Sequence, residues 1–256
     1  MRVAMRSAGL APSRLRRWAP GVRVLAVWAG GVTGALLATP ALAGPPYLTD
    51  DPEPTDTGHW EIYNFATGSA EPGTIAAQFG EDLNYGAAPD VQLTATLPLQ
   101  VATGLPVTAD NVQLAGKYRF ARQDGALGLD IAAFPRVFLP TAPGARHAQV
   151  LLPLWAQRDA GPWSVFFGGG WTLHPGTGQR NFWQGGAAVT RTVRPGWSLG
   201  VEYFAQGRDA DDGRPLRAVQ IGTQVHIHGP FSWLATLGQG LNARETTFYT
   251  ALKLDL

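Results

Sequence analysis

The stretch from Glu81 to Leu99, EDLNYGAAPDVQLTATLPL, constrains the fold of this chain more than any other, because apolar and polar residues alternate along it. Apolar side chains take every second position at Leu83, at Tyr85 and from 91 to 97. This period of two is typical of β-strands with two different faces. Residues 86–90 lie between the alternating runs and supply a turn, so the stretch predicts a β-hairpin.

Pairing across this turn sets Tyr85 opposite Val91 and Asn84 opposite Gln92, which makes one face of the hairpin apolar and the other polar. A soluble β-sandwich would bury the apolar face in its core. A membrane barrel would turn that face toward lipid and line its lumen with the polar face. The hairpin alone leaves both architectures open.

The N-terminus predicts export. Residues 1–43 contain six arginines and no acid, then an apolar run over 24–38 and the small-residue end at 41–43. This order of charge, apolar run and small residues is typical of a secretory signal peptide, with cleavage before Gly44. The run is shorter than the roughly 20 residues that a transmembrane helix needs, so we predict a cleaved signal rather than an anchor.

Removal of the signal changes the charge balance. The whole chain has 20 Lys and Arg against 19 Asp and Glu, and loss of the six leader arginines leaves 14 against 19, a net charge of about −5. This balance leaves no basic surface for nucleic acid. The chain has no cysteine, so an exported protein of this length must be stable without disulfides.

The rest of the chain repeats the alternating pattern and shows no helical periodicity. We predict a single antiparallel transmembrane β-barrel of the outer-membrane type over 59–256, all-β and about twelve strands. The predicted strands are 59–67, 75–85, 91–98, 111–120, 127–138, 148–157, 163–173, 181–191, 197–206, 216–227, 231–240 and 245–256.

Loop lengths favour the barrel over the sandwich. Connections after the even-numbered strands are short, at 86–90, 121–126, 158–162, 192–196 and 228–230. Connections after odd-numbered strands are mostly longer, at 99–110, 139–147, 174–180 and 207–215. Short periplasmic turns opposite longer external loops are typical of outer-membrane barrels. We therefore predict location in the outer membrane of a Gram-negative-type cell, with both termini periplasmic.

The polar faces of the predicted strands identify candidate lumen-lining residues: Asn84, Gln92, Gln113, Lys117, Arg119, Asp130, Phe134, Arg136, Glu202, Gln220 and Gln224. A turn at 121–126 would set Lys117 opposite Asp130, Arg119 opposite Gly128 and Arg136 opposite Asn111. The same counting pairs Glu202 with Gln220. Lumenal charges of both signs predict no strong selection between cations and anions.

Other polar groups have ordinary explanations. The acidic run at 50–56 lies in residues 44–58, which we predict to be a periplasmic lead-in to the barrel or a segment inside the lumen, since it lacks the spacing of a calcium loop. His226 and His228 share a predicted strand face, but no third metal ligand accompanies them. No nucleophile and base are paired. We predict no metal, no cofactor and no catalytic residues.

The segment from Phe248 to Leu256 is apolar at alternate positions up to the terminus. It resembles the C-terminal strand by which outer-membrane barrels are recognised for assembly, although Leu256 replaces the usual terminal aromatic residue. The resemblance implies the barrel-assembly machinery and outer-membrane lipid as partners.

Three groups of residues carry a family resemblance. They are Gly44–Pro54, Gly58–Glu61 with Leu83–Gly86, and Leu152–Trp155 with Gly161–Trp163 and Gly168–Trp171. In these residues the chain resembles the outer-membrane transporter barrels named after the MetA pathway of phenol degradation. The resemblance implies an outer-membrane barrel linked to uptake of aromatic or other small organic compounds.

The sequence thus predicts a passive channel for small organic solutes, uncharged or aromatic ones included. A structural or binding barrel without flux is the alternative. An outer-membrane lipid enzyme is the third hypothesis, and the lack of a nucleophile–base pair argues against it.

Overall fold

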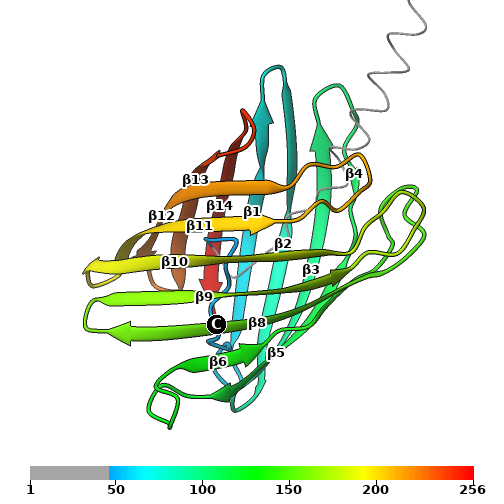
Figure 1. Cartoon of the computed structure of the whole chain (residues 1–256). Helices are drawn as coiled ribbons and strands as arrows, with labels where there is room; N and C mark the ends of the chain where they lie inside the picture. Colours follow the sequence, from blue (N-terminus) through cyan, green and yellow to red (C-terminus); the bar gives the residue numbers. More distant parts are fainter. Residues whose placement is uncertain (1–45) are drawn as a thin grey trace, which may run out of the picture. The chain divides into compact units, whose positions relative to one another are not determined.

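The structure, a computed structural model, describes residues 46–256, which form one antiparallel sheet without helices (Figure 1). Its strands are β1 (Trp60–Glu71), β2 (Thr74–Ala88), β3 (Val91–Ala102), β4 (Thr108–Ala109), β5 (Gln113–Ala121), β6 (Asp130–Ala133), β7 (Arg136–Phe138), β8 (Gln149–Ala160), β9 (Trp163–Leu173), β10 (Phe182–Arg194), β11 (Trp197–Gln206), β12 (Leu216–His228), β13 (Phe231–Gly240) and β14 (Thr246–Asp255). The predicted signal peptide, 1–43, lies outside the described residues. Within those residues no helix is long and apolar enough to cross a membrane.

The sheet closes into a barrel because the last strand pairs with the first, from Glu61 opposite Asp255 to Ala70 opposite Thr246. The 14 strands occupy twelve wall positions. Strand β4 is a short pairing at the end of β3, while β6 and β7 are two parts of one wall strand between β5 and β8. Closure leaves no free sheet edge to be protected. The predicted antiparallel barrel of twelve strands is confirmed.

The predicted strand 127–138 is interrupted at Pro135, which separates β6 from β7. Proline has no backbone N–H to donate to the sheet. The carbonyl of Pro135 still accepts a hydrogen bond from the Gly116 amide at 3.2 Å, and the Phe134 amide donates to Pro153 at 3.3 Å. The wall therefore stays bonded across the interruption.

The connections follow the predicted sorting at one end with one departure. Turns at 89–90, 161–162, 195–196 and 229–230 are two residues long and lie at the end of the barrel that holds Trp60 and Asp255. The connection between β5 and β6, predicted as a short turn at 121–126, runs instead over 122–129. At the other end the β1–β2 connection is only Pro72-Gly73, while the later ones are longer.

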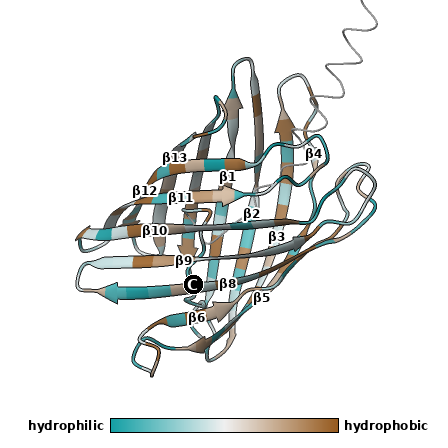
Figure 2. Ribbon diagram, in the orientation of Figure 1, coloured by the Kyte–Doolittle hydropathy of each residue, from teal (hydrophilic) through white to brown (hydrophobic). Residues whose placement is uncertain are grey.

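The two faces of the wall differ as the alternation predicts, and Figure 2 shows hydrophilic and hydrophobic residues interspersed along the strands. Large apolar side chains cover the outward face, including exposed Leu93, Leu114, Val201 and Ile221. The inner face, which turns toward the lumen, is polar but contains buried aromatic rings. These rings include Tyr63, Phe65, Phe134, Phe138, Trp155, Phe166, Phe182, Phe204 and Tyr249.

Strand register departs from prediction at two hairpins. In the first, Tyr85 pairs with Leu93 rather than Val91, because the strands continue to a two-residue turn at 89–90 and an irregularity between Gly86 and Ala88 moves the register by one residue. The net shift of two residues preserves the faces. Asn84 correspondingly pairs with Thr94 rather than Gln92.

The second departure concerns the predicted lumenal ion pair. Arg119 pairs with Ala132 rather than Gly128, so the Lys117–Asp130 pairing is wrong. Arg136 pairs with Ala115 rather than Asn111. The longer 122–129 connection moves the register by four residues. On the other side of the barrel, the predicted pairing of Glu202 with Gln220 is confirmed.

Candidate functional site in the barrel lumen

Residues 46–57 form an irregular stretch, here called the inner segment, that packs among inner-face side chains and is drawn in blue in Figure 1. Thr49 and Asp50 have no exposed surface, and Tyr47 and Thr55 are also buried. At its end, Thr57 forms a parallel bridge with Gly86 of β2. Of the acidic run at 50–56, Asp50 lies buried inside the lumen, as one of the two predicted placements has it, whereas Glu53 and Asp56 are exposed.

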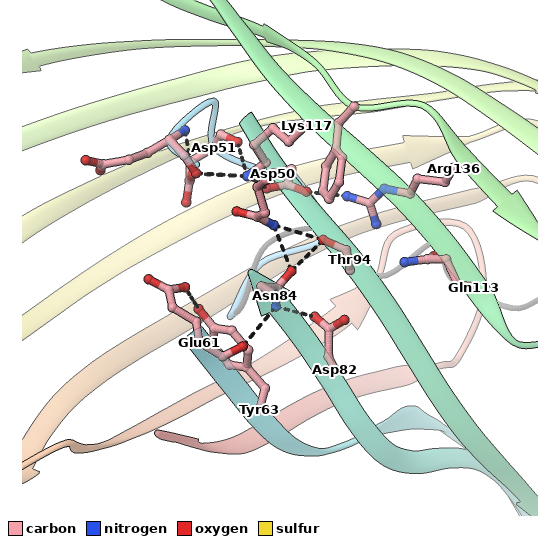
Figure 3. Close-up of a pocket in the computed structure, with 13 residues that line it drawn as sticks. Asp50, Asp51, Glu61, Tyr63, Asp82, Asn84, Thr94, Gln113, Lys117 and Arg136 are labelled. Carbon is pink, nitrogen blue, oxygen red and sulfur yellow. Dashed lines mark hydrogen bonds and ion pairs between the residues drawn. The ribbon is translucent and has the colours of Figure 1, made fainter. Parts of the chain in front are cut away.

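Asp50 is the centre of the charged contacts of the inner segment (Figure 3). Its Oδ1 accepts a hydrogen bond from Lys117 Nζ at 3.1 Å, and its Oδ2 accepts one from the Arg136 guanidinium. Lys117 also donates to the backbone carbonyls of Asp51 and Glu53, at 2.9 and 3.1 Å. Buried charges are costly unless they are paired and hydrogen-bonded. Here Asp50 serves two buried cations, and Asp51 Oδ1 lies 3.5 Å from Lys117 Nζ as well.

The ring of Phe134 lies beneath the same two cations. Its centroid is 4.8 Å from Lys117 Nζ and 4.2 Å from the Arg136 guanidinium carbon. This geometry permits cation–π attraction, which strengthens where water is excluded. The aromatic residue that the sequence placed on the inner face therefore supports the charged cluster.

An amide network holds the far end of the inner segment. Gln92 Oε1 accepts hydrogen bonds from the backbone amide of Thr55 at 2.8 Å and from its hydroxyl at 3.1 Å. Gln92 Nε2 in turn donates to Asn84 Oδ1 at 2.7 Å. Gln92 thus binds the inner segment directly, and Asn84 supports it through Gln92.

Across the lumen, Glu202 of β11 receives the near end of the inner segment. Its carboxylate accepts hydrogen bonds from the backbone amides of Leu48, at 3.1 Å, and Thr49. Gln220 of β12 donates a third, at 3.0 Å. A buried carboxylate surrounded by donors in this way is satisfied without a cation.

Glycines of β10, β11 and β12 make room for the first residues of the inner segment. A Cβ at Gly186 would overlap the Thr49 hydroxyl, and one at Gly200 would overlap the Tyr47 hydroxyl. At Gly222 a Cβ would lie 2.7 Å from Tyr47 Cε1. The inner face of these strands thus forms a recess that fits the Tyr47 ring, which also packs on Phe166 with centroids 5.7 Å apart.

The space left beside the charged cluster is small. A cavity of about 50 Å³ is lined by five carboxylates, two cations and several neutral side chains. Two of its lining atoms, Gln113 Oε1 and Arg136 Nε, are buried without a hydrogen-bond partner among the described residues. This volume accommodates a few water molecules and is far less than the roughly 300–1,000 Å³ of typical ligand pockets.

The predicted lumen candidates fall into two groups. Asn84, Gln92, Gln113, Lys117, Phe134, Arg136, Glu202 and Gln220 are buried on the inner face. Arg119, Asp130 and Gln224 are partly exposed. Arg119 lies toward the short-turn end, where its Nε is 2.8 Å from Asp90 and its guanidinium 3.9 Å from Asp130.

The candidate lumen residues predicted from sequence did not include Tyr47 or Asp50, although a place inside the lumen was one of the two alternatives for the run at 50–56. The available signal was indirect, because Lys117 and Arg136 on a buried polar face require a carboxylate partner and the acidic run at 50–56 could supply one.

Residues 46–256 contain no cluster of three or more His, Cys, Asp or Glu side chains that could hold a metal ion. His226 and His228, predicted to share a face, do not. A register irregularity between them pairs His226 with Ser232 and His228 with Phe231, which are on opposite faces of β13.

Comparison with known proteins identifies the fold. The chain resembles the COG4313 outer membrane channel from Pseudomonas putida F1, with a TM-score of 0.58 and 14% identity over 77% of this chain and 94% of that one. A KdgM porin solved in complex with disordered oligogalacturonate has a TM-score of 0.55 and 7% identity over 77% of this chain and 98% of that one. A NanC porin has a TM-score of 0.53 and 9% identity over 77% of this chain and 100% of that one. The fold is thus that of outer-membrane channel and porin barrels.

No family model matches the chain, and no curated protein matches its sequence. The resemblance to the family named after the MetA pathway therefore stays a prediction.

Proposed function

We propose that this protein is a passive outer-membrane channel for small organic solutes, with uncharged or aromatic compounds as its preferred class. The observation that carries the proposal is the sorting of the two faces of a closed wall. Apolar residues such as Leu114, Trp163 and Ile221 are exposed outside, whereas polar residues are buried inside. A soluble barrel would aggregate through such a surface, but lipid would cover it.

The inner face supports the solute class. Amide and hydroxyl groups of Asn84, Gln92 and Thr94 lie near the rings of Phe134 and Tyr63, so polar and aromatic contacts occur on one wall. Charges of both signs lie in the lumen, and Lys117 and Arg136 are paired with Asp50, which argues against a strong preference for cations or anions. The similar fold of known channels and porins agrees with this function.

Localisation is tested by membrane fractionation and by comparing boiled and unboiled samples on a gel. We expect the protein in the outer-membrane fraction, with a heat-dependent shift in mobility. A soluble periplasmic protein without a shift would refute the membrane barrel.

A barrel without flux is the second candidate, and the inner segment favours it because free space beside Asp50 is limited to about 50 Å³. Swelling of reconstituted vesicles in small uncharged solutes separates the two. We expect slow swelling for the wild type and much faster swelling for a variant lacking residues 46–57. If neither form increases swelling over empty vesicles, the channel proposal is wrong.

Substitutions assign the path within the wall. Lys117→Ala and Arg119→Ala should each alter the swelling rate or conductance several-fold, because they remove lumenal side chains. Leu114→Ala and Tyr118→Phe, on the exposed outward face, serve as matched controls and should conduct like the wild type. Equal conductance of all four folded variants would exclude the assigned path.

A further inference from the structure

Glu81 lies on the outward face of the barrel. It pairs with Asn64 of β1 and with Leu97 of β3, and both partners are exposed on that face. Its neighbour Asp82 points to the lumen, where it accepts a hydrogen bond from the buried Thr96 hydroxyl at 2.8 Å. By this alternation, Glu81 is the one acidic residue on the outward face of the barrel strands within residues 46–256.

The position of Glu81 is deep in the wall. At the short-turn end of the same strands, the rings of Trp60 and Tyr85 stack with centroids 4.7 Å apart, as in the aromatic girdle at a membrane interface. Asn64 and Glu81 are each four residues from that pair. At ~3.3 Å per residue and a tilt of ~40°, this is about 10 Å along the barrel axis, near the middle of an apolar band about 25 Å tall.

Neither side chain has a partner in the described chain. No hydrogen bond or ion pair within residues 46–256 involves the Glu81 carboxyl or the Asn64 amide. The cations on the outward face, such as Arg158 and Arg191, belong to β8 and β10, far from β1 and β2 in the strand order. An ionisable group at this depth is costly and indicates a functional contact.

The two side chains are complementary to each other. The Asn64 amide offers two donors and one acceptor, and the Glu81 carboxyl offers acceptors and, when protonated, a donor. A two-fold axis through this patch would bring Asn64 of one copy to Glu81 of the other, and the reverse contact would follow by symmetry. The adjacent outward residues of β1, Ala66 and Gly68, are small and would permit close approach.

We propose that a second copy of this chain packs on the outward face of β1 and β2, held by reciprocal Asn64–Glu81 hydrogen bonds within the membrane. This inference rests on the membrane location proposed above. A dimer would remove both polar side chains from lipid without a change in the lumen, because the contacts lie on the opposite face of the wall.

The test uses the absence of cysteine from the chain. A single cysteine at the exposed residue Glu71, labelled with one dye, allows photobleaching steps to be counted in vesicles at several protein-to-lipid ratios. We expect two-step traces for this otherwise wild-type protein. In its background, Glu81→Leu and Asn64→Leu should each weaken dimerisation about five- to tenfold, since each removes a polar contact in lipid worth ~1 kcal/mol or more.

Glu81→Gln, which retains hydrogen-bonding groups, should dimerise nearly as the parent does. Val201→Leu, on the exposed outward face of β11, is the matched control and should have no effect. One-step traces at every ratio for the parent, or equal dimerisation of the Glu81→Leu variant, would overturn the inference. Heat-dependent mobility and swelling measured on the same samples would show whether the channel proposal still stands.

Discussion

The two walls that hold the inner segment do so by different means. On β3, β5 and β7 the segment is bound by charge and hydrogen bonds, through Gln92, Lys117 and Arg136. On β10, β11 and β12 the inner face has glycines, and the ring of Tyr47 fills the space that they leave. One wall therefore recognises the segment through buried ions and the other mainly through shape.

This difference separates two consequences of losing the segment. Without Asp50, the charged wall would retain two buried cations that lack their main partner. Without Tyr47, the glycine wall would have only an unfilled recess. Buried charges that have lost a partner cost more than an unfilled recess that water can enter, so the charged wall should dominate the stability of the inner segment in the lumen.

The largest effect is expected for Asp50→Asn. Loss of this carboxylate leaves Lys117 and Arg136 buried without their shared counter-ion, which should destabilise the barrel by ~3–5 kcal/mol and increase single-channel conductance. Stability is measured as the temperature at which heated samples change from the gel mobility of the folded barrel to that of the unfolded chain. Asp56→Asn, an exposed acid of the same segment, is the matched control. A melting temperature equal to that of the wild type would show that the ion pairs do not hold the segment.

The charged wall can be tested further by restoring its balance. Adding Lys117→Met and Arg136→Met to the Asp50→Asn variant removes the two cations that have lost Asp50, so stability should recover in large part. Conductance should remain high in this triple variant. If stability recovers and conductance falls back to the wild-type value, shape alone holds the inner segment in the lumen.

The glycine wall should respond less. Gly222→Ala places a Cβ against the Tyr47 ring and against Thr236, and overpacking of this kind costs roughly 2–3 kcal/mol. Adding Tyr47→Ala should relieve part of that cost, as a double-mutant cycle would reveal. Gly116→Ala is the control, since a Cβ there meets no atom closer than 3.8 Å. Additive effects of the two substitutions would exclude contact between Tyr47 and Gly222.

A smaller effect is expected for Glu202→Gln. The carboxylate accepts from Leu48, Thr49 and Gln220, whereas a glutamine offers one oxygen and turns an NH₂ group toward a donor. We expect a loss of about 1–2 kcal/mol in stability and more frequent opening events in single-channel records. If opening events are as frequent as in the wild type, the inner segment is held by the charged wall and the Tyr47 recess and not by Glu202.

The smallest effect concerns the Asp90 turn, outside both walls. Partial burial raises the pKa of Asp90, but hydrogen bonds from Arg122 and Arg119 outweigh it and hold the pKa below its ordinary 3.8. The ionised carboxylate therefore stabilises the fold in full at pH values above its ordinary pKa of 3.8. This contribution is lost as the pH falls through the lowered pKa of the folded state. Asp90→Asn should cost ~0.2–1 kcal/mol at pH 7 and progressively less as the pH falls through the lowered pKa. A cost that does not change with pH would contradict an ionic contribution, and Asp124→Asn is the control.

The alternation of side chains determined the fold and most strand bounds, because a period of two is a local property that records which face meets lipid. Strands 163–173, 197–206 and 231–240 were predicted to the residue. The pairing of Glu202 with Gln220 followed because a nearly regular β11–β12 register relates them. Pairings beside the 122–129 connection failed, since loop conformation sets register and alternation fixes only its parity.

The inner face of each candidate strand was likewise readable from sequence, so most lumen residues were identified. What only the tertiary structure decided was their partner. Asp50 meets Lys117 and Arg136 across sequence separations of 67 and 86 residues, and Tyr47 meets glycines on strands still more distant. Such contacts have no periodic pattern in the sequence, because they form only when closure of the barrel brings distant residues together. The sequence determined a barrel with a polar interior, and the closure of that barrel decided that its own N-terminal residues would occupy it.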